Sequence, residues 1–391
     1  MQPVRTMLLL ALFVILTSCS SQSSTSPAST SATVTIVLPT ATPTAVSVNL
    51  NPLTTAQAWG DVHIAQFGLT TNTLTFQPGG AYSQNAVTND DQVCGSVSPP
   101  TTIDTVQRLL QIQMLELFNL HTGVLTNLYT APAGYGINTC AVTDQWIVWT
   151  ESYGIGYGDL QSNWRVKAIN RQTQEVRLLD ASKLPNGQQA PAKIIPFPSS
   201  GHGMAAWTTF LDNQGNTAAV IYDFATKQKT FQAQGTSFPL ISWPWICWGD
   251  GTQLGIVFNN METQQQTLLK ENPATSAFNN SAFVVSNANY SAITVYPTIG
   301  PDMAAQSYVV GNGINGDFVE FPSVNDRLIT WASNETVFAF DRKLQRPVKI
   351  LEGLTGNPYP LVSGHYMIWA KHDPNNVLKT IMYVIDTNTL P

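Results

Sequence analysis

Oxygen-bearing side chains that follow tryptophan-containing segments are the first residues in this 391-residue chain to suggest chemistry. They are Glu151, Asp250, Asn334, Glu335, His372 and Asp373. If these segments end at one side of a closed fold, their oxygens could hold a polar ligand or Ca²⁺, which takes about 6–8 oxygen ligands. Two carboxylates facing each other across a saccharide could also serve a glycosidase. The simpler interpretation is that these residues are solvated turn residues.

Two further tryptophans could bind a ligand through their rings. Trp243 and Trp245 flank Pro244 just before an apolar segment. Because they stand at alternate positions, both rings could face one side and form an aromatic platform. Packing in the core is the competing interpretation, since tryptophan has a large apolar surface to bury.

Familiar catalytic and metal-binding patterns are missing from the sequence. It contains no His-Glu-x-x-His, Gly-x-Ser-x-Gly, Cys-x-x-Cys or phosphate-loop glycine pattern. The histidines at 63, 121, 202, 365 and 372 do not have metal-ligand spacing on one helix. The sequence therefore predicts no catalytic residues and no metal cluster. Calcium on the loops above is the one cofactor that we keep as a hypothesis.

A two-part repeat must position these side chains. In its first part, a short apolar segment ends in tryptophan, at Trp149, Trp207, Trp248, Trp331 and Trp369. In its second part, an apolar segment runs into Asn/Asp-x-x-Thr, starting at Asn119, Asn170, Asp223, Asn260 and Asp386, with a variant at Asp341. Asn and Asp side chains cap tight turns, and the alternating residues after them are typical of half-buried strands.

The spacing of the repeat predicts the fold. Successive tryptophans are 58, 41, 83 and 38 residues apart, so a unit without tryptophan is expected inside the long gap, with a strand at 282–285. A period of about 40–50 residues with four strands per unit is typical of a β-propeller. We expect an all-β chain with one propeller over residues 55–391. Seven four-stranded blades fit best, and six or eight stay open. Residues 105–114 fit a helix or a strand, and we favour a strand.

The end of the chain indicates how the ring closes. Only residues 387–391 follow the turn at Asp386, which is too short for an outer strand. An unpaired sheet edge is an aggregation hazard, so an N-terminal strand should complete the last blade. Residues 62–67 and 73–76 are the candidates. The sequence thus predicts that residues 60–76 pair with the blade that contains Trp369 and Tyr383.

In architecture, residues 60–391 resemble the TolB-like and quinoprotein-like propellers of bacterial envelope proteins. The Ser-Pro-Asp-Gly turn of TolB-type repeats is missing, as are the Gly-His and Trp-Asp marks of WD40 repeats. The resemblance therefore implies the fold and no functional residue.

The N-terminus resembles the signal sequence of a bacterial lipoprotein. Arg5 precedes ten apolar residues at 7–16, a run too short for a spanning helix of about 20 residues. Leu16-Thr17-Ser18-Cys19 is similar to a lipobox. This implies removal of residues 1–18, a lipid on Cys19, and a location on the extracytoplasmic side of the cell membrane or the outer membrane. Residues 19–50 are rich in Ser, Thr and Pro, which predicts a disordered tether.

The composition and the cysteines limit which partners and which cysteine roles are expected. Charged residues make up 11% of the chain, its net charge is −6 and its pI about 5.3, which argues against a nucleic-acid partner. Cys94 and Cys140 lie in loop-like sequence and could form a disulfide outside the cytosol. Cys247 lies in a segment that reads as a buried strand.

These features favour a non-enzymatic, membrane-anchored module that binds a protein or an envelope glycan. One alternative is a polysaccharide-active enzyme, of the glycoside hydrolase or lyase type, with carboxylates on one propeller face. A second alternative is a structural subunit of a cell-envelope assembly.

Overall fold

The computed structural model describes the chain in ranges separated by gaps. They are residues 48–49, 65–70, 81–98, 110, 112–154, 157–184, 186–188, 194–234, 236–250, 255–270, 275–279, 281–287, 292–297, 299–300, 303, 305–309, 320–333, 336–351, 360–373 and 376–390. All of them belong to one unit, Ile36–Pro391. Cys19, most of the predicted tether, Asn334 and Glu335 lie outside the described residues.

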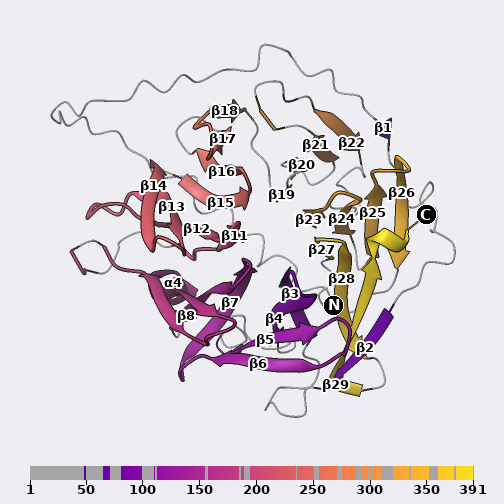
Figure 1. Ribbon diagram of the computed structural model, residues 1–391, viewed down its shortest axis with the longest axis horizontal. Coiled ribbons are helices and arrows are strands. Elements are labelled where there is room, and N and C mark those ends of the chain that lie inside the picture. The colour runs from indigo at the N-terminus through magenta and orange to yellow at the C-terminus, as the bar shows by residue number, and fades with distance from the viewer. Residues whose placement is uncertain are drawn as a thin grey trace, which may run out of the picture. The chain divides into compact units, whose positions relative to one another are not determined.

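The described strands form seven sheets that follow one another along the chain as the blades of a β-propeller (Figure 1). Blade 1 contains β3 (Ala81–Val87), β4 (Gln92–Ser98), β5 (Met114–Asn119) and β6 (Leu125–Thr130). Blade 2 contains β7 (Tyr135–Val142), β8 (Trp146–Tyr153), β9 (Trp164–Asn170) and β10 (Val176–Ala181). Blade 3 contains β11 (Ser199–Gly201), β12 (Met204–Phe210), β13 (Thr217–Asp223) and β14 (Gln228–Gln234). Blade 4 contains β15 (Thr236–Ser242), β16 (Trp245–Asp250), β17 (Gly255–Asn260) and β18 (Gln266–Leu269).

The remaining three blades complete the predicted seven. Blade 5 contains β19 (Thr275–Asn279), β20 (Ala282–Ser286), β21 (Ala292–Tyr296) and β22 (Gln306–Val309). Blade 6 contains β23 (Glu320–Val324), β24 (Leu328–Ser333), β25 (Thr336–Asp341) and β26 (Arg346–Leu351). Blade 7 contains β27 (Leu361–Ser363), β28 (Tyr366–Asp373), β29 (Asn376–Asp386) and β2 (Ala65–Thr70). The prediction of an all-β propeller with seven four-stranded blades is confirmed, including the unit without tryptophan, whose second strand is β20.

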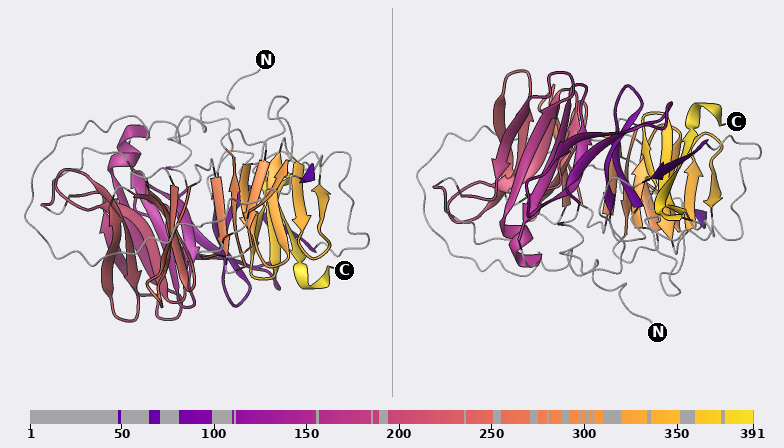
Figure 2. Two further views of the ribbon diagram at one scale, coloured as in Figure 1. Left: turned by 90° about the horizontal axis from the view of Figure 1, so that it is seen from above. Right: turned by 90° about the horizontal axis from the view of Figure 1, so that it is seen from below.

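The first strand of each blade is the innermost. These strands contact one another in sequence around the ring, from β3 and β7 through to β27, which contacts β3 again. We call the end of the ring at which the first strands begin the entry face, and the opposite end the turn face. The helix α4 (Tyr157–Ser162) follows β8 at the entry face, and the 3-10 turn η2 (Thr387–Thr389) follows β29 at the turn face. The two project to opposite sides in Figure 2. Neither these nor any other helix in the described ranges has the length and apolar character needed to cross a membrane.

An N-terminal strand closes the ring, as predicted. β2 pairs antiparallel with β29 over six residues, and Gln66 lies opposite Tyr383. Tyr383 in turn stacks on Trp369 of β28, with ring centroids 5.3 Å apart. The outer strand of the last blade is therefore supplied by the start of the domain.

A second N-terminal strand lies on a different blade. β1 (Val48–Asn49) pairs in parallel with β22, which makes blade 5 a five-stranded sheet. These two residues lie inside the range for which the sequence predicts disorder. Residues 48–49 thus extend blade 5, whereas β2 completes blade 7.

Seven clusters of buried apolar side chains among the described residues hold neighbouring blades together, one at each interface. The five repeated tryptophans are buried, and each faces the preceding blade, as Trp149 does toward blade 1 and Trp369 toward blade 6. They are therefore packing residues of the blade interfaces. Burying a tryptophan removes a large apolar surface from water, so these rings stabilise the interfaces.

Blades 1 and 5 lack this tryptophan. In blade 2, Trp149 stands three residues after Trp146, which pairs with the turn residue Asn170. In blade 1, Gln92 pairs with the turn residue Asn119, and the residue three positions after Gln92 is Gly95. In blade 5, the residue three positions after Ala282, the first residue of β20, is Val285. Because these positions carry no tryptophan, β3 and β4 have no repeat signature in the sequence. The strand expected at 105–114 is not confirmed: β5 starts at Met114, and Leu110 is helical.

The Asn/Asp turns form as expected. The side chain of Asn119 accepts hydrogen bonds from the backbone N–H groups of His121 and Thr122, and Asn170 and Asn260 each bind their own turn in the same way. The residue after the turn Asn or Asp also bonds across its own blade, to the hairpin between the first two strands. For example, the N–H of Arg171 donates to the carbonyl of Gln145. These bonds tie the two hairpins of a blade together at the turn face.

Candidate functional site

Two exposed phenylalanines lie at the entry face, beside the first strands of blades 3 and 4. Phe197 stands two residues before β11, and Phe238 lies near the start of β15. Their side chains are 47% and 42% exposed, and the ring centroids are 5.8 Å apart with an interplanar angle of 40°. β11 and β15 contact each other near the axis of the ring. We call Phe197 and Phe238 the aromatic pair.

Prolines hold the aromatic pair in place. Pro198 and Pro239 directly follow the two phenylalanines, and both are buried. By the strand registers, Pro198 stands opposite Trp207 and Pro239 next to the residue opposite Cys247. A proline fixes its own φ and restricts the residue before it, so the backbone under each ring has few alternatives.

Phe238 has an unusual backbone conformation. Its φ is +50°, a region that bulky residues rarely adopt. It lies in a bulge, where the register shifts between Ser237 and Leu240. Its N–H donates to Oγ1 of Thr208 on blade 3 at 3.1 Å, which holds the strained residue in place. Bulges and strained residues of this kind often aim a side chain at a functional site.

Two hydroxyl groups near the aromatic pair form hydrogen bonds with backbone groups. Oγ1 of Thr150 donates to the carbonyl of Pro196 at 2.7 Å, and Oγ of Ser199 accepts from the N–H of Ile241 at 3.1 Å. Residues 194–201 and 236–242 contain no charged side chain. These two segments therefore offer no charge of their own, and the half-buried Asp250 of β16 stands opposite Thr236.

The sequence contains a signal for this pair that the tryptophan repeat obscured. An aromatic residue followed by proline stands ten residues before four of the tryptophans, at 197 and 207, 238 and 248, 321 and 331, and 359 and 369. Pro322 and Pro360 are buried, as Pro198 and Pro239 are. The side chains of Phe321 and Tyr359 lie outside the described residues. The motif thus recurs in blades 3, 4, 6 and 7.

Glu151 is not a loop ligand, and that expectation is wrong. It lies inside β8, paired with Ile137 on β7 and Arg165 on β9, because the strand continues past Trp149. Its side chain is fully buried and forms ion pairs with Arg165 and with Lys167, the latter at 2.7 Å. The Tyr129 hydroxyl of blade 1 lies 3.3 Å from Oε2 of Glu151 and accepts from Lys167 at 2.8 Å. The carboxylate of Glu151 is thus paired with basic side chains inside the fold.

The other expected ligand residues are not brought together among the described side chains. Asp250 ends β16 and is half-buried, and His372 and Asp373 belong to β28 rather than to a loop. The side chains of His372 and Asp373 lie outside the described residues, as do Asn334 and Glu335. Within the described part of the chain, no three His, Cys, Asp or Glu side chains are grouped as metal ligands would be. A calcium site stays a prediction, which the melting temperature with calcium and with a chelator would test.

Trp243 and Trp245 do not share one face, so the predicted platform is wrong. Both are half-buried. Trp243 packs on the cluster between blades 3 and 4 and stacks on His202, with ring centroids 4.2 Å apart. Trp245 packs on the cluster between blades 4 and 5. Trp245 starts β16, whereas Trp243 belongs to the hairpin before it, where the Trp243–Pro244 peptide bond is cis. Alternation along a strand therefore does not relate the two rings.

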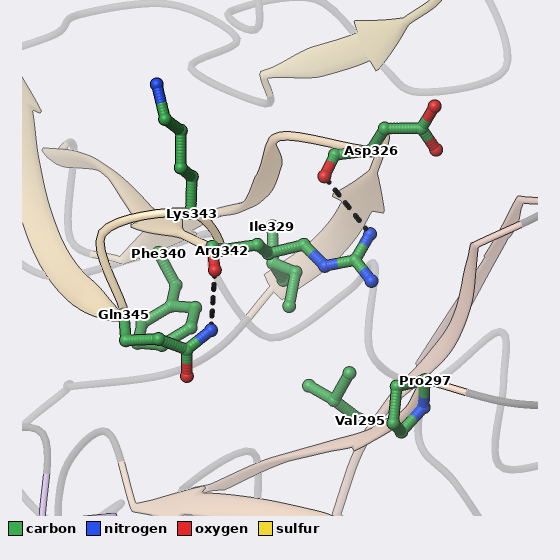
Figure 3. Close-up of a pocket in the computed structure, with 8 residues that line it drawn as sticks. All are labelled: Val295, Pro297, Asp326, Ile329, Phe340, Arg342, Lys343 and Gln345. Carbon is green, nitrogen blue, oxygen red and sulfur yellow. Dashed lines mark hydrogen bonds between the residues drawn. The ribbon is translucent and has the colours of Figure 1, made fainter. Parts of the chain in front are cut away.

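A pocket of about 320 Å³ lies at the turn face between blades 5 and 6 (Figure 3). It is lined by Val295, Pro297, Asp326, Ile329, Phe340, Arg342, Lys343 and Gln345. Arg342 donates to Oγ and to the carbonyl of Ser281, on the blade 5 hairpin, and to the carbonyl of Asn325. The guanidinium thus connects two blades, and we interpret the pocket as a packing gap beside this contact.

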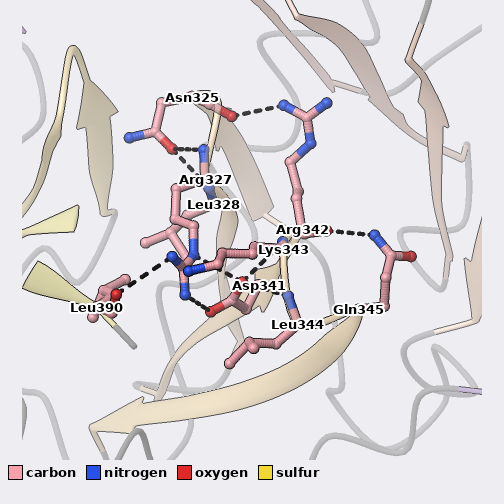
Figure 4. A network of polar contacts seen from close by, with 9 residues as sticks. All are labelled: Asn325, Arg327, Leu328, Asp341, Arg342, Lys343, Leu344, Gln345 and Leu390. Atoms are coloured by element: carbon pink, nitrogen blue, oxygen red, sulfur yellow. Dashed lines mark hydrogen bonds and ion pairs between the residues drawn. The ribbon is translucent and has the colours of Figure 1, made fainter. Parts of the chain in front are cut away.

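A second polar network lies next to the pocket and connects blades 6 and 7 (Figure 4). Arg327 binds the buried carboxylate of Asp341 in a bidentate pair, at 2.9 and 2.8 Å. Asp341 also accepts from the N–H groups of Lys343 and Leu344 as the turn residue of its blade. Arg327 reaches the carbonyl of Leu390 at 3.5 Å. These contacts are structural, because every group in them serves a turn or an interface.

A further pocket, of about 280 Å³, lies between blades 2 and 3 and is lined in part by Asp180, Lys183, Phe210 and Lys229. Asp180 accepts from Nε1 of Trp207 at 2.7 Å and lies 3.5 Å from Nζ of Lys229. Its carboxylate therefore also serves an interface between blades.

A disulfide joins blades 1 and 2. Cys94 of β4 and Cys140 of β7 are bonded, with Cα atoms 6.7 Å apart, and both are buried in the cluster between these blades. Cys247 is a free, buried cysteine, and burial raises the pKa of its thiol far above the usual range. A thiol in such surroundings is unreactive.

Comparison with known proteins shows a fold and no family. No family model matches the chain, and no curated protein matches it. Among solved structures, a chain of a mitotic checkpoint complex has a TM-score of 0.50 and 7% identity, over 84% of this chain and 95% of that one. A prolyl endopeptidase has a TM-score of 0.50 and 10% identity, over 85% of this chain and 48% of that one. Pyrococcus horikoshii acylaminoacyl peptidase has a TM-score of 0.50 and 8% identity, over 81% of this chain and 54% of that one. At these identities the likeness shows the β-propeller alone.

Proposed function

We propose that this protein is a binding module that holds a ligand at the entry face of its propeller, on Phe197 and Phe238. The observation that carries the proposal is the exposure of two neighbouring phenyl rings beside innermost strands, one of them in a strained conformation. Exposed aromatic residues on a rigid scaffold are typical anchors of a binding surface. A strained phenylalanine costs about 1–3 kcal/mol and needs a compensating role.

The state of Glu151 favours a binding module over a polysaccharide-active enzyme. A glycosidase needs two carboxyl groups facing each other in an open cleft, about 5–10 Å apart. Glu151 is buried and paired with Lys167 and Arg165, so its carboxylate is not open to a saccharide.

We further propose that the module is anchored to a membrane by a lipid on Cys19, on the extracytoplasmic side of the cell membrane or outer membrane. The support is the motif Leu16-Thr17-Ser18-Cys19 after an apolar run. Metabolic labelling with a fatty-acid analogue should mark the wild type and leave Cys19→Ala unlabelled. Equal labelling of both would contradict a lipid at this residue.

The binding proposal is tested with the full chain, purified in detergent and immobilised. Envelope extract is passed over the wild type, over the double variant Phe197→Ala/Phe238→Ala, and over Leu178→Ala. Leu178 is a matched control, because it is an apolar residue 60% exposed on β10 of blade 2. We expect a ligand that the wild type and Leu178→Ala retain and the double variant loses. Identical retention by all three chains would contradict a role for the aromatic pair.

A further inference from the structure

Blade 5 differs from the other described blades in carrying a fifth strand. β19, β20, β21 and β22 already give it the four strands of the repeat, and β1 is added outside β22 (Figure 1). Val48 of β1 stands opposite Tyr308, and Asn49 stands opposite Val309. The propeller closes through β2 on blade 7, so neither the blade count nor the ring closure requires β1. The role of β1 is therefore to be sought at the edge that it covers.

The edge under β1 is suited to pairing with a further strand. An outer strand presents a row of backbone N–H and C=O groups, which a bulge, a proline or a charged side chain can protect. β22 (Gln306–Val309) contains no proline and no charged residue. Its register against β21 is regular over all four residues. β22 itself thus has none of these three protections.

Four other blades protect their outer strands by a bulge. The register shifts once between the third and the outer strands of blades 1, 2, 3 and 6. A bulge bends the outer strand and interrupts its row of backbone groups. β2 and β18 are regular, as β22 is, but no described strand pairs with their outer edges. Among the described strands, a regular outer edge that is covered by a further strand therefore occurs in blade 5 alone.

The covering strand is weakly held. β1 pairs over two residues, whereas β2 pairs over six. Each backbone hydrogen bond contributes little net free energy in water, because an open strand forms hydrogen bonds with water instead. The pairing is also parallel, which is the slightly less stable arrangement per residue. β1 can therefore detach while blade 5 stays folded, and its detachment exposes the backbone groups of β22.

An exposed β22 can pair with β22 of a second copy. Two identical strands align antiparallel about a two-fold axis, so that the same edge serves both copies. The four residues of β22 offer a longer pairing than the two residues of β1. β1 competes with this pairing because it belongs to the same chain, which gives it a high effective concentration. The attached strand thus keeps the copies apart, and its removal lets them join.

We propose that β1 is a displaceable cap on the outer edge of blade 5, and that the uncapped edge joins two copies of this chain through β22. The aromatic pair takes no part in this device, so the inference stands independently of the proposed function.

The test is sedimentation velocity of the full chain, purified in detergent, over a range of concentrations. Val48→Pro/Asn49→Pro removes both backbone N–H groups of β1 and should release the cap. Val48→Ala/Asn49→Ala is the matched control, because it keeps these N–H groups. We expect the proline variant to dimerise at concentrations where the wild type and the alanine variant do not. A peptide of residues 44–52, added in excess, should reverse the dimerisation, and the same peptide with Val48→Pro should not.

Hydrogen exchange provides a second measurement, which does not depend on association. At low concentration, the amides of residues 306–309 should exchange faster in the proline variant than in the alanine variant, because their cover is lost. Equal exchange in both variants would mean that β1 does not cover β22 in solution. Equal sedimentation of all three chains would overturn the proposal. Dimerisation that the peptide does not reverse would also overturn it, because the copies would then meet at another surface.

Discussion

Glu151 and Lys167 form an ion pair inside blade 2, with Oε1 of the buried carboxylate 2.7 Å from Nζ of the lysine. Arg165 contacts the same carboxylate and lies over the ring of Tyr135, with Cζ 3.7 Å from its centroid. One buried acid thus pairs with two basic side chains at the interface with blade 1. Removing one partner of a buried pair leaves an uncompensated charge, which costs more than the pair itself contributes.

The substitution Glu151→Gln should therefore lower the free energy of unfolding by about 3–5 kcal/mol, because Arg165 and Lys167 lose their counter-charge. Urea unfolding measures the change. The control is Glu175→Gln, which removes a surface carboxylate paired with Arg177 and should change stability little. If both variants unfold at the same denaturant concentration, Glu151 is not the centre of this network.

The disulfide between blades 1 and 2 gives a second prediction. Cys140→Ala should lower the free energy of unfolding by about 2–4 kcal/mol, because Cys94 and Cys140 close a loop with a sequence separation of 46. A reductant should lower the melting temperature of the wild type and leave that of Cys140→Ala unchanged. Mass spectrometry of a non-reduced digest should show the two cysteines in one linked peptide pair. Two separate free-thiol peptides would contradict the bond.

The register of the closing strand can be tested by cross-linking. Leu69 of β2 lies opposite Thr380 of β29. Leu69→Cys with Thr380→Cys should form a disulfide under mild oxidation, because directly opposite residues bring their Cβ atoms close. Leu69→Cys with Ile381→Cys is the control, since a shift by one residue points the second side chain to the other face. Cross-linking of the shifted pair alone would mean that the register differs.

Acid should weaken one contact between blades 1 and 2. Burial raises the pKa of Asp90, but hydrogen bonds from Arg171 and Thr88 outweigh it and hold this pKa below its usual 3.8. A carboxyl with a lowered folded pKa stabilises the fold above its unfolded pKa, and this contribution is lost as pH falls through the folded value. Asp90→Asn should therefore melt below the wild type at pH 7, and the difference should begin to shrink as the pH falls below about 3.8 and vanish only below the lowered folded pKa.

A double variant checks that this contact is the cause. Arg171→Gln alone should reproduce the loss at pH 7, because Arg171 donates to both carboxylate oxygens of Asp90. Asp90→Asn combined with Arg171→Gln should be no less stable than either single variant. Fully additive losses would show that the two residues act separately.

The fold could be predicted from the sequence wherever a blade carries the repeated tryptophan and the Asn/Asp turn. Trp149 and its equivalents are large side chains at one register position, and the Asn/Asp turns set the hairpins, so both leave a periodic signal. Gly95 and Val285 occupy the same position without tryptophan. The spacing of the repeat still predicts blade 5, whereas nothing in the sequence predicts β3 and β4, because no earlier unit sets a period for them.

The candidate site was harder to predict, because it depends on contacts between blades. Glu151, Arg165 and Lys167 meet through strand register, and Tyr129 joins them from another blade, so no local pattern marks them. Trp243 and Trp245 stand at alternate positions, but Trp243 lies in the hairpin between β15 and β16, so alternation along one strand does not apply to them. The aromatic–proline motif was present in the sequence, but the exposure of Phe197 and Phe238 is known only from the structure.

The two N-terminal strands also decide how the ring would respond to mechanical tension. β1 pairs over only two residues with blade 5, and β2, further along the chain, pairs over six residues with blade 7. A pulling force applied at the N-terminus reaches β1 first and must detach it before any load reaches β2. The short parallel pairing of β1 would then break first, and the longer pairing of β2, which keeps the propeller closed, would stay intact until it does.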